Sequence, residues 1–360
     1  MTRDNEIANA ASEAMTETLM SCPMYEFSSK ATDLLECAYI KGAEWADKHP
    51  ADWLDWFSDA FCLTKAVLAG TKTMTRRLLK VPKTCNGKEV YSFNVLINNA
   101  GTQCVDLVDE NGGVLGSWKP HYEVGEIVAI AQPYKDIIEC LPMYSNAILD
   151  EVGMPRKEYK AGWTNKMFAR ADLTPHHIRI TDVKIERLQD ISDEDCIKEG
   201  VGAFLKVICE KASGKYEKKS DNIYWITGRG YDQSLSYCHN CARKEVEALN
   251  QKIGKGYEKY IIDGGWGVED EHPCFCEKCG KPLLFDFCGN VDLELPNLDL
   301  RYESDLYMLN QILSQDDEDA EKVIRYFARE AFASLIDKIS GKGTWESNPF
   351  VVAYSFKLID

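Results

Sequence analysis

Residues 176–200 read HHIRITDVKIERLQDISDEDCIKEG, a stretch that predicts a strand followed at once by a helix. Over 176–188 apolar residues alternate imperfectly with basic and polar ones, as they do in a half-buried strand. The polar residues of Asp190-Ile191-Ser192-Asp193 are typical of a helix N-cap, and Gly200 is the expected end of the short helix. This strand–helix unit is the reference from which the rest of the fold is predicted.

Upstream of this unit the sequence predicts further strands. Residues 91–99, 104–109 and 114–118 alternate as strands do, with a hairpin turn at 109–113, and another strand follows Gly125. Downstream, residues 202–320 are more polar and less regular. The chain then predicts one helix over 321–339 and a final strand over 349–359. Early strands, a long interruption and a late helix and strand imply an α+β fold with a discontinuous β-barrel.

The totals restrict the class of protein. The chain has 360 residues and a formal net charge of −16. Such a surface repels nucleic-acid backbones at long range, which disfavours a role as a protein that coats DNA non-specifically. No apolar run approaches the roughly 20 residues that span a bilayer, and the start lacks a signal-peptide pattern, so we expect a cytoplasmic protein without membrane contact. In that setting, 14 cysteines indicate metal ligands and buried thiols.

One short stretch is basic, although the chain as a whole is acidic. Residues 61–83 contain six basic side chains and no acidic one. Those six are Lys65, Lys72, Arg76, Arg77, Lys80 and Lys83. A local basic site on an acidic chain favours a specific anionic ligand, since lysine, arginine and nearby threonine hydroxyls can donate to phosphate or carbonyl oxygens. Composition alone equally allows a solvated basic edge strand.

A second motif predicts a metal site. Residues 237–283 read YCHNCARKEVEALNQKIGKGYEKYIIDGGWGVEDEHPCFCEKCGKPL. Two Cys-x-x-Cys pairs supply the four soft ligands that zinc prefers, and the glycine after the last cysteine suits the turn that closes a knuckle. The predicted ligands are Cys238, Cys241, Cys276 and Cys279. Four thiolates leave no open position, so the zinc would fold its segment without catalysing a reaction.

Two other interpretations of these cysteines stay open at this point. Cys274 or His239 could replace one of the four ligands. A redox-active Cys-x-x-Cys is the other option, although two pairs without a thioredoxin-like pattern favour a metal.

Three segments together resemble the ASCH domain, a relative of the PUA domain. They are the Gly70-Thr71-Lys72-Thr73-Met74-Thr75-Arg76 turn after a short helix, the strand–helix unit above, and the closing helix and strand with NPFVVAYSFKLI. The stretch WTNKMFARADLTPHHIRI is similar to long ASCH proteins of tailed phages and prophages. The resemblance covers about 60–134, 160–202 and 321–358. If the chain is phage-encoded, as the similarity to phage proteins implies, we expect it to act in the host cytoplasm.

The resemblance implies a PUA-like β-barrel with flanking helices, interrupted by a zinc-ribbon-like insertion. The expected segments are an N-terminal helical extension (1–57), the first part of the barrel (58–202), an insertion (203–320, with the zinc module at about 236–285) and the closing helix and strand (321–360). Family members are thought to bind RNA or nucleotide-like ligands. The ligand-binding positions would be Gly70, Lys72, Thr73, Arg76 and Arg77.

A small branch of the family hydrolyses the acyl amide of N4-acetylcytidine. Its working lysine, threonine and glutamate match Lys72, Thr75 and Glu199 here. A desolvated lysine could act as base toward the threonine hydroxyl while the glutamate moves a proton to the leaving amine. Three hypotheses follow: recognition of RNA or a modified nucleotide, hydrolysis of an N4-acylated cytidine, and a phage adaptor that binds a host or virion protein through the insert.

Overall fold

The computed structural model describes most of the chain after residue 53. The described residues are 54–55, 57–97, 103–141, 143, 145–152, 162–164, 166, 169–228, 235–255, 257–266, 268–315 and 317–359. The helical extension expected over 1–57 therefore lies almost wholly outside them. The chain forms two compact units, the first made of 1–57, 125–180 and 358–360, the second of 58–124 and 181–357.

The first unit has a short sheet and a small helical core. Its elements are β1 (Leu54–Asp55), β8 (Ile127–Ile130), α4 (Tyr134–Cys140), α5 (Ser145–Val152), η3 (Ala171–Leu173) and the start of β9 (His177–Arg187). Strand β8 pairs in parallel with β1 and antiparallel with β9. Tyr134, Ile137 and Ile148 are buried together in the core, and the Tyr134 hydroxyl accepts a hydrogen bond of 2.8 Å from the Arg170 N–H.

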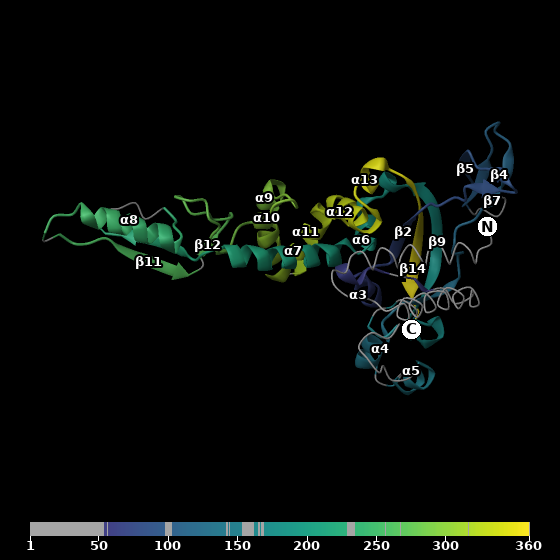
Figure 1. The fold of residues 1–360 in the computed structure, drawn as a ribbon, viewed down its shortest axis with the longest axis horizontal. Helices are drawn as coiled ribbons and strands as arrows, with labels where there is room; N and C mark the ends of the chain where they lie inside the picture. The colour runs from purple at the N-terminus through teal and green to yellow at the C-terminus, as the bar shows by residue number, and fades with distance from the viewer. Residues whose placement is uncertain are drawn as a thin grey trace, which may run out of the picture. The chain divides into compact units, whose positions relative to one another are not determined.

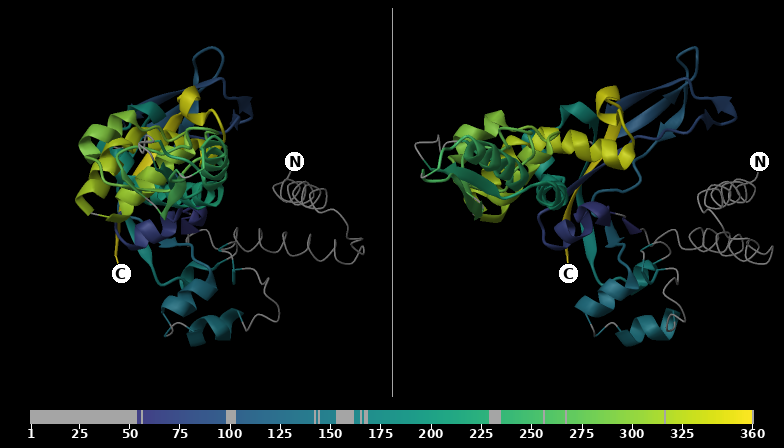
Figure 2. Two further views of the ribbon diagram at one scale, coloured as in Figure 1. Left: turned by 90° about the vertical axis from the view of Figure 1, so that its left-hand side faces the viewer. Right: turned by 60° about the vertical axis from the view of Figure 1, so that its left-hand side comes forward.

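The described strands of the second unit that lie outside the cysteine-containing segment belong to several small sheets. Strand β2 (Met74–Leu78) pairs antiparallel with β14 (Phe350–Leu358), which neighbours β9. Strands β5 (Ser92–Ile97), β6 (Gln103–Val108) and β7 (Val114–Trp118) form the antiparallel sheet that the hairpin pattern predicted. Figure 2 shows this sheet in blue as a small twisted layer of its own. A two-stranded ribbon, β3 (Thr84–Cys85) with β4 (Lys88–Glu89), precedes it.

The helices of the second unit form its main core. They are η1 (Asp59–Phe61), α3 (Leu63–Leu68), η4 (Leu188–Asp190), α6 (Asp193–Lys198), α7 (Val201–Lys219), α8 (His239–Gln251), α9 (Val291–Glu294), η5 (Leu295–Asn297), α10 (Glu303–Gln315), α11 (Asp317–Tyr326), α12 (Ala328–Ser340) and α13 (Thr344–Ser347). Helix α6 confirms the predicted capped helix, since the Ser192 hydroxyl accepts from the Asp195 N–H. Helix α7 packs against α10 and α12, burying Phe204, Leu205 and Phe332.

The segment around the four cysteines forms a module at the C-terminal end of α7 (Figure 1). Strands β10 (Ile223–Thr227) and β11 (Ile261–Trp266) pair antiparallel, and α8 covers them. Strands β12 (Val268–Asp270) and β13 (Phe285–Phe287) pair in parallel beside this hairpin. Ile223, Ile226, Tyr237 and Leu283 form a separate buried core for the module.

Two expectations need correction. The described strands form several small sheets and no closed barrel, because β1 pairs only with β8 and β2 only with β14 among them, so the end strands do not meet. The helix expected over 321–339 is two helices, α11 and α12, separated at Phe327. Within the described residues, no helix is long and apolar enough to cross a membrane.

Candidate metal centre, ion-pair network and cavity

The four predicted metal ligands come from two knuckles of the module. Cys238 is the N-cap of α8, so Cys241 lies in the first helical turn. The second knuckle is closed by backbone hydrogen bonds of 2.8 Å from the Cys276 N–H to Lys281 and from the Gly280 N–H to Cys276. Gly280 has a φ of 68°, a left-handed conformation that glycine adopts at little cost.

The four thiols are arranged as a tetrahedral metal site requires. Their sulfur atoms all lie within 4.8 Å of one another, and the sulfurs of Cys238 and Cys279 are 3.8 Å apart. In a tetrahedral site with metal–sulfur bonds of about 2.3 Å, neighbouring sulfurs lie about 3.8 Å apart. Cys238 and Cys276 are buried, while Cys279 is exposed. The cluster is consistent with a metal site of the zinc type.

The thiols of the cluster differ in how readily they lose a proton. Burial, followed by hydrogen bonds with the other three thiols, raises the pKa of Cys241 to about 12. Burial alone would also raise the pKa of Cys276, but backbone N–H donors that include Lys278 and Cys279 lower it to about 7. One sulfur therefore takes negative charge first, and a bound cation would let the others follow.

The two alternative ligands lie outside this cluster. The Cys274 thiol donates to the Asp270 carboxylate at 3.2 Å, and the His239 ring packs on Tyr224 with centroids 5.1 Å apart. Neither belongs to the group of four.

The basic turn is folded inward. Its backbone is fixed by the Thr71 and Lys72 N–H groups, which both donate to the Ala66 carbonyl at the end of α3. The Lys72 ammonium donates to the Met74 carbonyl (2.7 Å), the Glu199 carbonyl (2.7 Å) and the Glu199 carboxylate (3.0 Å). Lys72 is 2% exposed and Glu199 is 4% exposed, so the structure brings these two predicted site residues together inside the protein.

Arg76 extends this contact into a network. Its guanidinium donates to the second Glu199 oxygen at 3.0 Å, to Glu186 at 2.6 and 3.0 Å, and to Asp195 at 3.3 Å. Burial alone would lower the pKa of Arg76, but the charges and hydrogen bonds of Glu199 and Glu186 raise it above its ordinary value. Lys184 also pairs with Glu186. Lys198 donates to Asp195 at 2.9 Å, so the network contains three carboxylates and four basic groups.

A glycine makes room for this network. Gly200 follows Glu199 and has a φ of 85° between α6 and α7. A Cβ at Gly200 would lie 3.2 Å from the Lys72 Cβ and 3.3 Å from its Cδ. Both the left-handed backbone and the close Lys72 stem therefore require glycine here.

The other predicted site residues surround this network without joining its ion pairs. Thr75 is buried on β2 opposite Tyr354, and strand alternation puts it on the face opposite Arg76. The Thr73 N–H donates to the Lys198 carbonyl at 2.9 Å. Arg77 is half-buried and Gly70 is exposed. As placed, the charges of Lys72 and Arg76 are balanced within the protein.

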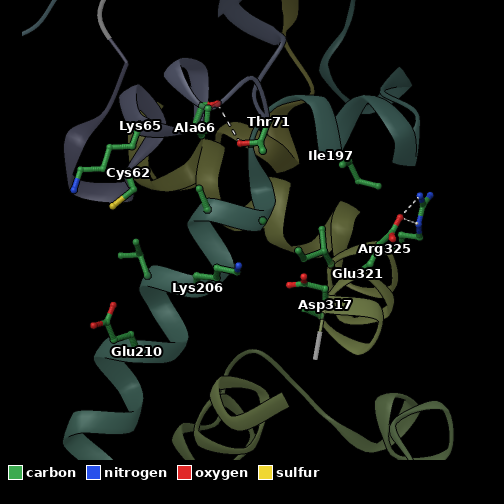
Figure 3. Close-up of a pocket in the computed structure, with 17 residues that line it drawn as sticks. Cys62, Lys65, Ala66, Thr71, Ile197, Lys206, Glu210, Asp317, Glu321 and Arg325 are labelled. Atoms are coloured by element: carbon green, nitrogen blue, oxygen red, sulfur yellow. Dashed lines mark hydrogen bonds and ion pairs between the residues drawn. The ribbon is translucent and has the colours of Figure 1, made fainter. Parts of the chain in front are cut away.

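A cavity of about 580 Å³ lies beside this turn, and sequence reasoning did not find it (Figure 3). Helix α3 and Thr71 supply one wall, the start of α7 supplies the floor, and α11 supplies the far wall. Asp317 and Glu321 line it, although the acidic stretch 316–321 that contains them has the composition of a solvated loop or helix start. The cavity depends on contacts between segments far apart in sequence, so no local pattern could indicate it.

Comparisons of this chain with protein-family models, curated proteins and solved structures gave no match.

Proposed function

We propose that this chain is an ASCH-type protein that recognises RNA or a modified nucleotide, with a structural zinc ion in its insert. The contact between Lys72 and Glu199 carries the proposal. The resemblance linked these two positions from separate segments, and in the fold their charged groups are 3.0 Å apart. Such an approach of two motif residues supports the family resemblance in a way that a single local motif does not.

The burial of the network favours a small ligand over a long nucleic acid. Lys72 and Arg76 are 2% and 6% exposed, so their charges are engaged with carboxylates and do not form an open phosphate-binding surface. The net charge of −16 further disfavours contact with many phosphates. In this arrangement the network shapes the turn, and the ligand would contact its outer side at Gly70, Thr73 and Arg77.

Binding measurements with an exposed-side variant test this proposal. Calorimetry with nucleoside monophosphates, and anisotropy with a labelled single-stranded RNA, would compare wild type with Arg77→Ala at low and physiological salt. Lys83→Ala is the matched control, because Lys83 is an exposed base in the same stretch. We expect weaker binding for Arg77→Ala alone. If wild type bound neither ligand at low salt, the proposal would be wrong.

Amide hydrolysis is the second candidate, favoured because two of its three residues, Lys72 and Glu199, are in contact. Lys72 donates three hydrogen bonds here, so it would have to release one and lose a proton before accepting the Thr75 proton. The test is release of cytidine from N4-acetylcytidine by wild type and Glu199→Gln, with Glu194→Gln on the same helix as control. Turnover that Glu199→Gln alone abolishes would support hydrolysis, and absence of turnover by wild type would exclude this substrate.

A protein-binding role of the insert has one observation in its favour. Tyr257, Ile261 and Phe275 are 60%, 61% and 47% exposed on the module. Tyr260, another aromatic of the insert, packs against the module's core and would be a poorer contact. A pull-down with wild type and a Tyr257→Ser/Phe275→Ser variant tests this adaptor role, which predicts a partner that only wild type retains.

A further inference from the structure

The cavity beside the basic turn has an apolar floor of small residues. Gly202 and Ala203 at the start of α7 belong to this floor, and Ala320 and Ile324 of α11 add apolar surface from the far wall. Small side chains leave a broad and shallow apolar surface, which suits a flat ring better than a branched aliphatic group. The volume of about 580 Å³ lies in the range of small-molecule sites.

Charged groups without ion-pair partners surround this floor. In the described part of the chain, no hydrogen bond or ion pair involves the side chains of Lys65, Lys206, Glu210 or Asp317, all of which line the cavity. Arg325, by contrast, is held by Glu321 at 3.0 and 2.5 Å. The four unpaired groups are therefore available to a ligand at no cost in protein ion pairs.

These groups occupy distinct places along the cavity. Figure 3 shows Lys65 and Glu210 at one end, Asp317 at the other, and Lys206 between them. The Lys206 ammonium lies over the middle of the cavity and points toward Asp317 of α11, whereas the Lys65 ammonium lies at the opposite end from Asp317. An anionic group would be favoured near the Lys206 ammonium, and hydrogen-bond donors near Asp317 and Glu210.

We propose that this cavity binds a nucleoside monophosphate, with the base on the Ala203 surface. The phosphate contacts Lys206, a ribose hydroxyl donates to Glu210 one turn later on α7, and an amino group of the base donates to Asp317. The inference rests on the proposed function and goes beyond it, because it places the nucleotide in the cavity that Thr71 and Lys206 line, as an alternative to contact at Gly70, Thr73 and Arg77. Helix α7 supplies most of the floor, so residues after 200 would help to build the site.

Calorimetry with CMP and AMP tests this site, with cytidine and inorganic phosphate as partial ligands. We expect Lys206→Ala to weaken binding of the monophosphates roughly tenfold, through loss of a charge-assisted contact, and to leave cytidine binding unchanged. Ala203→Phe should abolish binding because its ring would occupy the surface on which the base is proposed to lie. The matched controls are Lys218→Ala, an exposed lysine later on α7, and Ala203→Ser. Both controls should bind as wild type does.

The outcomes separate the two proposals. If Lys206→Ala and Ala203→Phe bound as tightly as wild type while Arg77→Ala lost binding, the cavity assignment would be overturned and the proposed function would stand. If wild type bound no nucleotide, both would fall. The metal content of each variant, measured in parallel, shows that the module has remained folded.

Discussion

The Lys72 ammonium and the Glu199 carboxylate lie 3.0 Å apart, although 127 positions separate them in the chain. Arg76 holds the other oxygen of the same carboxylate, also at 3.0 Å. The turn after α3 is thereby tied to the junction of α6 and α7. Because these groups are buried, each charge depends on the others for stabilisation, and the loss of one partner leaves the rest uncompensated.

Replacement of Glu199 tests the energetic weight of this network. We expect Glu199→Gln to reduce the free energy of unfolding by about 3 kcal/mol, because it leaves Lys72 and part of Arg76 without their carboxylate. Urea denaturation measures the change. Glu194→Gln removes an exposed carboxylate from the same helix and should change stability by less than about 0.5 kcal/mol. Equal effects of the two variants would contradict a buried network.

The conformation of Gly200 leads to a second prediction. Gly200→Ala should destabilise the fold by at least about 1 kcal/mol, because alanine disfavours a left-handed backbone and its Cβ would crowd Lys72. Gly214→Ala is the matched control within α7, where nothing lies within 4 Å of an added Cβ. That variant should gain about 0.5–1 kcal/mol from helix propensity. Thermal and urea unfolding would report the opposite signs.

The metal centre predicts different results for two neighbouring cysteines. Cys276→Ser should lose stoichiometric zinc, measured by elemental analysis, and should expose residues 221–288 to proteolysis because metal binding stabilises such modules. Cys274→Ser should keep one zinc ion per chain, since its sulfur contacts Asp270. Zinc retention by Cys276→Ser, or its loss from Cys274→Ser, would require a different ligand set.

Acid sensitivity provides a fourth prediction. Burial would raise the pKa of Asp195, but the hydrogen bond from Lys198 and the charge of Arg76 lower it below its ordinary value. A carboxyl with a lowered folded pKa contributes stability above its unfolded pKa of about 3.9, and this is lost as the pH falls through the folded value. Asp195→Asn should therefore show a shallower loss of unfolding free energy below about pH 5 than wild type. Asp182→Asn, exposed on β9, should keep the wild-type slope.

Local signals explain which parts of this molecule could be predicted. Alternation and turn residues predicted β5 to β7 and β9, a capping serine predicted α6, and paired cysteines at close spacing predicted the metal ligands. Each of these features depends on neighbours only a few positions away. The two cysteine pairs lie far apart in the sequence. Their association could still be predicted, because a metal that takes four ligands needs both pairs.

Other features depend on contacts that the sequence does not encode locally. The basic residues of the turn suggested an exposed binding surface, but Glu186 and Glu199 reach Lys72 and Arg76 from more than 100 positions away and draw them inside. Sheet closure likewise depends on whether distant end strands meet, and alternation cannot determine that. Helix α7 was overlooked because glycines and lysines obscure an apolar series that recurs at helical spacing.

Helix α7 also sets a mechanical relation between two sites. Its 19 residues form a rod of about 28 Å that begins at the cavity floor and ends at the module, where the Tyr216 hydroxyl donates to the Leu283 carbonyl. A ligand that fixes one end of this rod and a metal that fixes the other act on the same element. Any increase in ligand affinity caused by the metal must be matched by an equal increase in metal affinity caused by the ligand, because such coupling is reciprocal.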